Sequence, residues 1–292
     1  MKPAPFNYRA PDKLTEALDL LATYGSDAKV LAGGQSLVPA MNFRLNRFAL
    51  LIDINRIREL EYIRIDGQVL RIGALTRHRD IEMSPLVREH APLVAEAVRH
   101  VAHLPIRTRG TIGGSLSHAD PAAEIPAIVL ALDGTLVLQS RTGARSVRAT
   151  EFFQGMFSTA LQPNELLVEI QLPVAQPGQR FAFEEVSRRR GDFAIVGVGA
   201  MVNLQHGRIS QARFAACGVG TGPVRLRAAE QLLEQQVPTA ALFARAAAAA
   251  AAAVDPQTDI HADAEYRRRL LAGLVERVGM RAAGLSEGAK RD

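Results

Sequence analysis

The chain has 292 residues, of which 48% are hydrophobic and 22% charged, as expected for a globular protein long enough to form two or three lobes. No apolar run is long and uncharged enough to cross a bilayer, and residues 1–5 do not lead into a signal-peptide core, so we expect a cytoplasmic protein without a membrane span. The single cysteine, Cys217, excludes an internal disulfide framework and any iron–sulfur cluster held by this chain's own cysteines.

The net charge of +5 raises the question of a nucleic-acid partner. Arginines cluster at 188–190 and 267–269, but acidic residues adjoin both clusters. The chain has no tryptophan, only four tyrosines, and no zinc-finger or helix-turn-helix spacing. We therefore expect no nucleic-acid partner, and we interpret both clusters as solvated faces or subunit contacts.

Residues 1–56 have the pattern of a small α/β lobe. Apolar residues recur at helical spacing over 12–24 until Gly25 ends the helix. Short buried strands are expected at 28–32 and 50–54. Between them, Gly33 and Gly34 mark a turn from a strand into a helix. Consecutive N–H groups in such a turn attract anions, although a tight turn without a ligand is the simpler alternative.

Residues 57–175 form the second lobe. Alternating residues on either side of Asp66-Gly67 predict a hairpin with a type I′ turn. A second Gly-Gly turn, Gly113-Gly114, lies in an unusually polar stretch. The other expected elements are an amphipathic helix over 86–103, a buried helix over 125–132, and strands at 136–138 and 166–172.

Proline and glycine interrupt the pattern over 173–179, so a domain boundary is expected there, with a C-terminal domain over 176–292. Strands are expected at 180–187, 194–204 and 209–217, followed by helices over 224–235, around 246–253 and over 264–283. Strands followed by helices describe an α+β domain, and the whole chain is assigned to the α+β class.

One ligand explains both glycine pairs if it carries a pyrophosphate. Each turn would offer backbone N–H donors, and Gln35, Ser36, Thr111 and Ser115 would add side-chain hydrogen bonds. Neither turn fits a P-loop or the G-x-G-x-x-G fingerprint. The residues favour a phosphate-bearing cofactor without choosing one.

Other reactive residue types give no further site. The histidines lack a metal-ligand spacing, and Ser36 lacks the surroundings of a nucleophile. Cys217 lies in an apolar strand and is expected to be buried filler. Arg107 and Arg109 either steer phosphates or are ordinary solvent-facing arginines. We predict no catalytic residue and no metal ligand in this chain.

Five stretches, in order, resemble the FAD-binding medium subunit of molybdenum hydroxylases, the xanthine dehydrogenase family, and most closely its carbon monoxide dehydrogenase branch. They are residues 32–39 (AGGQSLVP), 51–54 (LIDI), 111–115 (TIGGS), 118–121 (HADP) and 188–194 (RRRGDFA). The resemblance covers essentially the whole chain. It implies a two-lobed FAD-binding domain of the vanillyl-alcohol-oxidase-like (PCMH) type over 1–175, with lobes of about 1–56 and 57–175, followed by the C-terminal domain.

The resemblance also implies the residues that hold FAD. The first pyrophosphate loop would be Ala32, Gly33, Gly34, Gln35, Ser36 and Leu37, and the second Thr111, Ile112, Gly113, Gly114 and Ser115. Asp120 would bond the ribityl region or neighbouring polar groups, with an Asx turn as its alternative. Leu167 would pack near the flavin, with an ordinary core leucine as its alternative, and Phe193 would stack beside the flavin where relatives often carry tyrosine. Glu184 stands where many relatives carry lysine near the cofactor.

The implied activity is electron transfer. A large molybdenum subunit would oxidise the substrate, a small subunit with two [2Fe–2S] clusters would relay electrons, and FAD on this chain would pass them to an acceptor, in a heterotrimer or a dimer of heterotrimers. Two alternatives stay open. One is a self-sufficient flavin oxidoreductase, and the other is a non-catalytic interaction subunit that has lost FAD.

Overall fold

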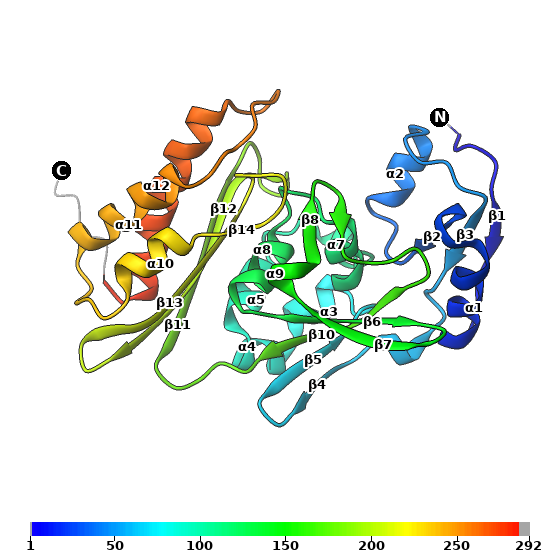
Figure 1. Ribbon diagram of the computed structural model, residues 1–292, viewed down its shortest axis with the longest axis horizontal. Helices are drawn as coiled ribbons and strands as arrows, with labels where there is room; N and C mark the ends of the chain where they lie inside the picture. Colours follow the sequence, from blue (N-terminus) through cyan, green and yellow to red (C-terminus); the bar gives the residue numbers. More distant parts are fainter. Residues whose placement is uncertain (1, 286–292) are drawn as a thin grey trace.

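The computed structural model describes residues 2–285, so Met1 and residues 286–292 of the predicted C-terminal domain lie outside it. Three larger sheets follow one another along the molecule, from the N-terminal lobe to the C-terminal helices (Figure 1), and β8 and β9 form a fourth, two-stranded sheet. Within the described residues, no helix is both long and apolar enough to span a membrane.

The first sheet is parallel and has the order β1-β3-β2, with β1 at Asn7–Arg9, β3 at Leu50–Asp53 and β2 at Ala28–Leu31. Helix α1, Leu14–Tyr24, buries Leu14, Ala17, Leu18 and Leu21, and ends at Gly25 as predicted. After β2 the chain turns through the first glycine pair into the short helix α2, Leu37–Asn42. The predicted strand–turn–helix order is confirmed, and it places the glycine pair at the carboxyl end of β2.

The second sheet is antiparallel and has the order β4-β5-β10-β6-β7. Its strands are β4 Ile63–Asp66, β5 Val69–Gly73, β10 Leu166–Pro173, β6 Thr135–Ser140 and β7 Gly143–Arg148. The hairpin β4–β5 is confirmed, but its turn is centred on Gly67 and Gln68. Only Gly67 has a positive φ, and a type I′ turn needs two, so that turn type is wrong.

Short helices cover this sheet: α3 His78–Met83, α4 Pro85–His90, α5 Pro92–Ala97, α6 Leu104–Arg107, α7 Ile112–His118, α8 Glu124–Ala131 and α9 Ala149–Phe152. The single helix predicted over 86–103 is wrong. It is broken at Ala91, whose backbone (φ −142°, ψ 62°) is not helical. Pro92 causes the break, because its ring disfavours a helical residue before it. The buried helix over 125–132 is confirmed as α8.

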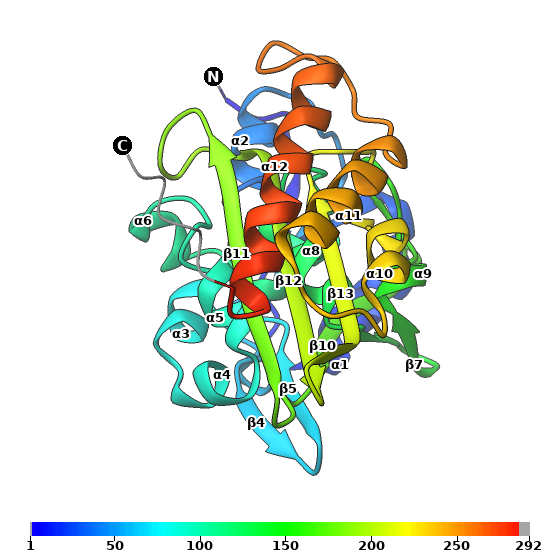
Figure 2. The same ribbon diagram turned by 90° about the vertical axis from the view of Figure 1, so that its left-hand side faces the viewer.

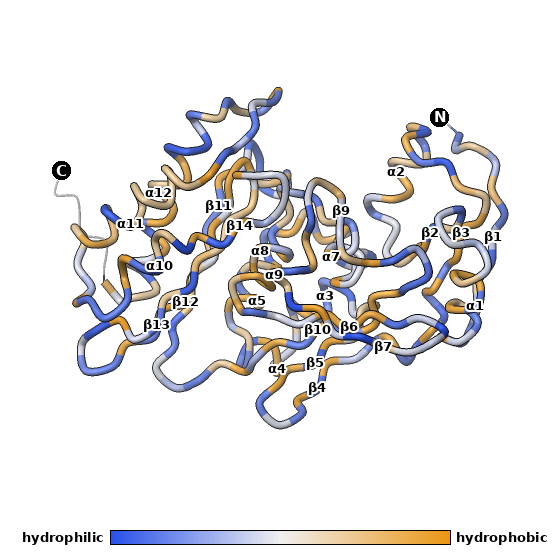
Figure 3. Tube along the Cα trace, in the orientation of Figure 1, coloured by the Kyte–Doolittle hydropathy of each residue, from blue (hydrophilic) through white to orange (hydrophobic). Residues whose placement is uncertain are grey.

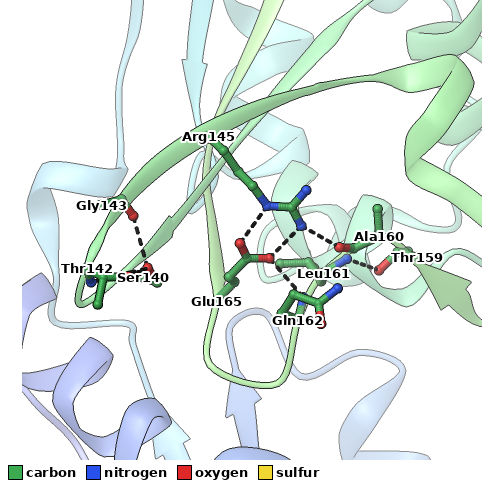
Figure 4. A network of polar contacts seen from close by, with 9 residues as sticks. All are labelled: Ser140, Thr142, Gly143, Arg145, Thr159, Ala160, Leu161, Gln162 and Glu165. Atoms are coloured by element: carbon green, nitrogen blue, oxygen red, sulfur yellow. Dashed lines mark hydrogen bonds and ion pairs between the residues drawn. The ribbon is translucent and has the colours of Figure 1, made fainter.

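An arginine fork fixes β7 to the segment that leads into β10 (Figure 4). The Arg145 guanidinium donates to both carboxylate oxygens of Glu165, at 2.7 and 2.8 Å, and to the Ala160 carbonyl at 2.7 Å. Glu165 also accepts from the Gln162 N–H at 2.9 Å. This region contains two short strands, β8 Phe153–Gly155 and β9 Ser158–Thr159.

The third sheet has three long antiparallel strands and one short strand, in the order β11-β12-β13-β14. They are β11 Gln179–Ser187, β12 Ala194–Gln205, β13 Arg208–Cys217 and β14 Val224–Arg225, followed by the helices α10 Arg227–Leu233, α11 Ala240–Ala252 and α12 Ala264–Ala282. The alanine-rich stretch is a packed helix, as predicted. Helices α10, α11 and α12 cover one face (Figure 2), while α5 and α8 contact the strands from the other lobe.

The hydropathy pattern follows this layering, since apolar segments concentrate between the layers and polar ones at loops (Figure 3). Every residue of α8 is buried, because it lies between the second and third sheets. Arg267 departs from the solvated face expected for its cluster. It is 6% exposed and donates to the Gly218 carbonyl at 3.0 Å and to Asp259 at 2.7 Å, which ties α12 to the end of β13.

Candidate functional site

The two glycine-containing segments touch each other, although they come from different sheets. A Cβ built on Gly33 would lie 2.5 Å from the carbonyl oxygen of Arg109 and 2.7 Å from the Cα of Gly110. A Cβ on Gly114 would lie 3.9 Å from the Cβ of Ala32. The first segment therefore rests directly on the second, close enough for one molecule to contact both.

The first segment presents a run of free backbone donors. Among the described residues, no acceptor takes the N–H groups of residues 33–37. The Gln35 side-chain amide donates to the Gly33 carbonyl at 2.9 Å, and Val38 N–H donates to the Gly34 carbonyl at 3.0 Å. Gly34 has a φ of +74°, a conformation that L side chains rarely adopt. Half-buried N–H groups without partners in a glycine turn are well suited to an anionic ligand.

The second glycine pair lies within a helix, so its interpretation as a turn with free donors is corrected. Gly113 and Gly114 belong to the first turn of α7, which Thr111 caps. The Gly113 N–H donates to Ala74 at 2.9 Å, the Gly114 N–H to the Thr111 hydroxyl at 3.1 Å, and the Ser115 N–H to the Thr111 carbonyl at 3.0 Å. What this segment offers a ligand is the hydroxyl group of half-buried Ser115, because Thr111 is buried and its hydroxyl caps α7.

Two of the four glycines are required by the chain's own packing. A side chain on Gly33 would collide with the second segment, and a Cβ on Gly113 would lie 2.6 Å from the Ala74 carbonyl oxygen. These contacts allow the backbones to approach each other. A glycine at position 33 is thus explained by the contact between the segments, with or without a ligand. The tight turn without a ligand is therefore not excluded by the glycines alone.

Positive charge surrounds the junction. Arg77 is half-buried beside Arg109, and burial, followed by the Arg109 charge, lowers its pKa without removing its charge. Neighbouring His78 is buried against Gly110, and burial lowers its pKa to about 4, so it is neutral at pH 7. Cationic side chains beside free N–H groups favour a phosphate group.

Arg107 is neither a phosphate ligand nor an ordinary solvent-facing side chain. It pairs with Glu82 at 3.1 Å and donates to the carbonyls of Val101 and Ala102 at 3.0 and 2.9 Å. This arginine fixes the loop between α5 and α6. The arginine that lies between the two glycine segments is Arg77, which the sequence analysis did not single out.

Asp120 follows α7, whose last residue, His118, lies against Phe157 with ring centroids 5.0 Å apart. One carboxylate oxygen of Asp120 accepts from the Ala122 N–H at 2.9 Å, which is the Asx turn named as the alternative. The second oxygen accepts no hydrogen bond from the described residues. Asp120 is half-buried, so a turn role and a cofactor contact are compatible.

The remaining predicted residues lie at different depths. Leu167 is buried in the same hydrophobic core as Ile112 and Leu116 of α7. Phe193 is 58% exposed in the loop between β11 and β12, where a flat side chain is available for stacking. Glu184 faces α12, where it accepts from Arg277 at 2.7 Å, on the opposite sheet face from Phe183.

The site fits an FAD pyrophosphate. Its first segment supplies unpaired N–H donors, its second supplies the Ser115 hydroxyl, and Arg77 and Arg109 add positive charge. Cys217 is buried, as predicted, and burial raises the pKa of its thiol, so it is not a reactive nucleophile. The arrangement is suited to a phosphate-bearing cofactor.

Comparison with known proteins agrees with this geometry. Residues 4–175 match the FAD binding domain in molybdopterin dehydrogenase, and residues 181–282 match the CO dehydrogenase flavoprotein C-terminal domain. The chain is 43% identical over 278 residues to the 6-hydroxypseudooxynicotine dehydrogenase complex subunit alpha of Paenarthrobacter nicotinovorans, covering 95% of this chain and 94% of that one. It is 41% identical over 284 residues to the caffeine dehydrogenase subunit beta of Pseudomonas sp. (strain CBB1), covering 97% and 96%.

Solved structures share the whole fold. Carbon monoxide dehydrogenase from Hydrogenophaga pseudoflava, in a form that lacks the Mo-pyranopterin moiety of its cofactor, matches with a TM-score of 0.95 and 40% identity, covering 97% of this chain and 99% of that one. The chain belongs to the family of FAD-binding subunits of molybdopterin-dependent dehydrogenases. The family predicted from the five motifs is therefore confirmed, and with it the FAD cofactor and the oxidoreductase class.

Proposed function

We propose that this chain holds FAD between residues 32–37 and 111–115 and carries electrons from an iron–sulfur partner to an external acceptor. The observation that carries the proposal is the contact of Gly33 with Arg109 and Gly110, which sets unpaired N–H donors beside a second polar segment. When bound, FAD supplies the redox chemistry.

The residues of this chain bind and orient. The pyrophosphate would be held by the N–H groups of residues 33–37 and by the Ser36 and Ser115 hydroxyls, and Arg109 would balance its charge. Thr111 would fix the start of α7 through its capping hydroxyl. The free oxygen of Asp120 would accept a hydrogen bond from the cofactor. Phe193 would cover the flavin ring, and Leu167 would close the apolar side of the pocket.

The chain acts within a complex of several subunits. We propose a small subunit with two [2Fe–2S] clusters and a large subunit with the molybdenum cofactor, assembled as a heterotrimer or a dimer of heterotrimers. Cys217 is buried and alone, so the clusters reside on the partner. A cytoplasmic location and a domain division between residues 175 and 176 belong to the same proposal.

Substrate specificity resides in the large subunit. This chain is similar throughout its length to subunits of dehydrogenases named for caffeine, for 6-hydroxypseudooxynicotine and for carbon monoxide. Compounds so different in size and polarity are accommodated by complexes whose FAD subunits share one fold. The residues described above select the cofactor, and the organic substrate is recognised elsewhere.

Purification of the chain alone and together with its two partners tests the proposal. The isolated chain should show a flavin absorption spectrum and no hydroxylase activity, and the reassembled complex should reduce an acceptor when given substrate. An isolated chain that oxidises an organic substrate unaided would favour the self-sufficient oxidoreductase. Absence of saturable FAD binding would favour the non-catalytic subunit.

A further inference from the structure

Asn55 and Arg77 form a chain of hydrogen bonds between the two glycine segments. The Asn55 Nδ2 donates to the Ala32 carbonyl at 2.8 Å, and the Asn55 Oδ1 accepts from the Arg77 Nη2 at 2.6 Å. The Arg77 Nη1 donates to the Arg109 carbonyl. Ala32 directly precedes Gly33, and the Arg109 carbonyl is the group on which Gly33 rests. This series of hydrogen bonds therefore begins and ends at the contact between the two segments.

Further hydrogen bonds hold the Asn55 side chain in place. Asp53 accepts from the Asn55 N–H at 2.9 Å and from its side chain at 2.6 Å, and Asp53 is itself bonded by the Tyr8 hydroxyl at 2.6 Å. Burial opposes ionisation of Asp53, but the hydrogen bonds from Tyr8 and Asn55 outweigh it and lower its pKa, so it is a carboxylate at neutral pH.

Arg77 is anchored by the backbone on both sides. It pairs with Thr111 in a β-bridge, the His78 N–H donates to the Gly110 carbonyl at 3.0 Å, and the Ile112 N–H donates to the Thr76 carbonyl at 3.1 Å. Arg77 therefore moves with the second segment, while Asn55 moves with the first. The side-chain bond between them joins the two segments beside the van der Waals contact at Gly33, while the lobes themselves share a buried apolar core that includes Ile52, Leu75 and Leu166.

We propose that Asn55 and Arg77 are positioning residues that set the separation of the two FAD-binding segments and thereby the affinity for FAD. This inference rests on the proposed assignment of residues 32–37 and 111–115 to the pyrophosphate. The carboxamide is needed because one side chain must donate to Ala32 and accept from Arg77. The guanidinium is needed because it donates along two directions in one plane, which an ammonium group does not.

The test is an equilibrium titration of the full-length apo-chain with FAD. The variants are Asn55→Ala, Asn55→Asp, Arg77→Met and Arg77→Lys, together with the double variant Asn55→Ala/Arg77→Met. Arg145→Met is the matched control, because it removes another half-exposed arginine with a carbonyl contact, whose bonds go to Glu165 and Ala160 and to neither glycine segment. The thermal midpoint and the visible circular dichroism of bound flavin are recorded for each.

We expect the Asn55 and Arg77 variants to raise the FAD dissociation constant by about tenfold to one hundredfold and to change the circular dichroism of the bound flavin. The double variant should lose no more affinity than the weaker-binding single variant, because either change breaks the same chain. Arg145→Met should lower the thermal midpoint and leave FAD affinity within about twofold of wild type. Asn55→Asp keeps the shape and the Arg77 contact but removes the side-chain donor to Ala32 and Asp53, so it tests that donor even where Asn55→Ala does not fold.

The positioning role would be refuted if the Asn55 and Arg77 variants lowered the thermal midpoint, as Arg145→Met does, but left FAD affinity unchanged. The proposed function would then remain intact. The role would also be refuted if the losses of FAD affinity in the two single variants added in full in the double variant, because Asn55 and Arg77 would then act independently of each other. A wild-type chain that does not bind FAD would overturn the proposed function and this inference together.

Discussion

Glu124, the first residue of α8, is buried within electrostatic reach of Glu185 on β11. Burial, and then the charges of Glu185 and Asp120, raise the pKa of Glu124 to about 8. Glu185 lies opposite Gly197 in the sheet register, Gly197 lies opposite Cys217 on the next strand, and the Glu185 carboxylate pairs with His100 at 3.4 Å. The two carboxyl groups therefore share one buried region, with Glu124 protonated at neutral pH.

Replacement of Glu124 by glutamine should remove a pH dependence of stability. The folded-state pKa lies above the ordinary value of 4.5, so folding favours the neutral form. The wild-type free energy of unfolding should fall as pH rises from about 4.5 to about 8, by roughly 2–4 kcal/mol. In urea unfolding at pH 6 and pH 9, Glu124→Gln should lack this loss. Glu16→Gln, on an exposed face of α1, should keep it, and equal slopes for wild type and Glu124→Gln would contradict the assignment.

An alanine at Gly33 should separate the two segments. The added Cβ would lie 2.5 Å from the Arg109 carbonyl oxygen, so the backbone must shift, at a cost of about 1–3 kcal/mol of stability. FAD affinity should fall at least about tenfold, as measured by titration. Gly222→Ala is the control, because its Cβ would have no neighbour nearer than 4.0 Å. Unchanged affinity in Gly33→Ala would show that the contact is irrelevant to the cofactor.

Lysine at Glu184 should affect stability more than the cofactor. Glu184 accepts two hydrogen bonds from Arg277, at 3.0 and 2.7 Å, and Arg281 lies 3.8 Å away. A lysine there would face two cations and should cost about 1–2 kcal/mol in thermal or urea unfolding. FAD affinity should stay as in wild type, since the side chain faces α12. A marked change in FAD affinity would instead support the cofactor contact that the family resemblance implies.

Alanine at Phe193 should change the flavin environment with little effect on stability. Because the ring is 58% exposed, its removal should alter the free energy of unfolding by less than about 0.5 kcal/mol. Fluorescence of the bound flavin should rise as an aromatic neighbour is lost, whereas Phe193→Tyr should keep it quenched. Identical flavin fluorescence in wild type and Phe193→Ala would place Phe193 away from the ring.

Local patterns were sufficient for most strands and for the helices of the third sheet. The strands β12 and β13 follow from the two largely apolar runs joined by His206-Gly207, and α1 follows from its apolar spacing and Gly25. The helix over 86–103 was wrong because periodicity continued through Pro92, where backbone sterics decided the outcome. Strand β7 was not predicted, because its mostly exposed residues follow no clear alternation.

The site was predictable only where it is built from a local sequence motif. Gly-Gly pairs indicated both segments, but glycine's low helix propensity concealed that Gly113 and Gly114 lie in a helix, which Thr111 and the packing on Ala74 stabilise. Asn55 and Arg77 are 22 residues apart and belong to no motif. The hydrogen bond between them depends on how the two lobes pack together, which cannot be predicted from a local sequence pattern.

The central claim is that two segments of this chain together hold the pyrophosphate of FAD. Its most direct test is a fluorescence titration of the apo-chain with FAD in the presence of ADP or of riboflavin. The account predicts saturable one-to-one binding of FAD, displacement by ADP, and much weaker binding of riboflavin, which has no phosphate. Equal affinity for riboflavin and FAD, with no competition from ADP, would contradict it.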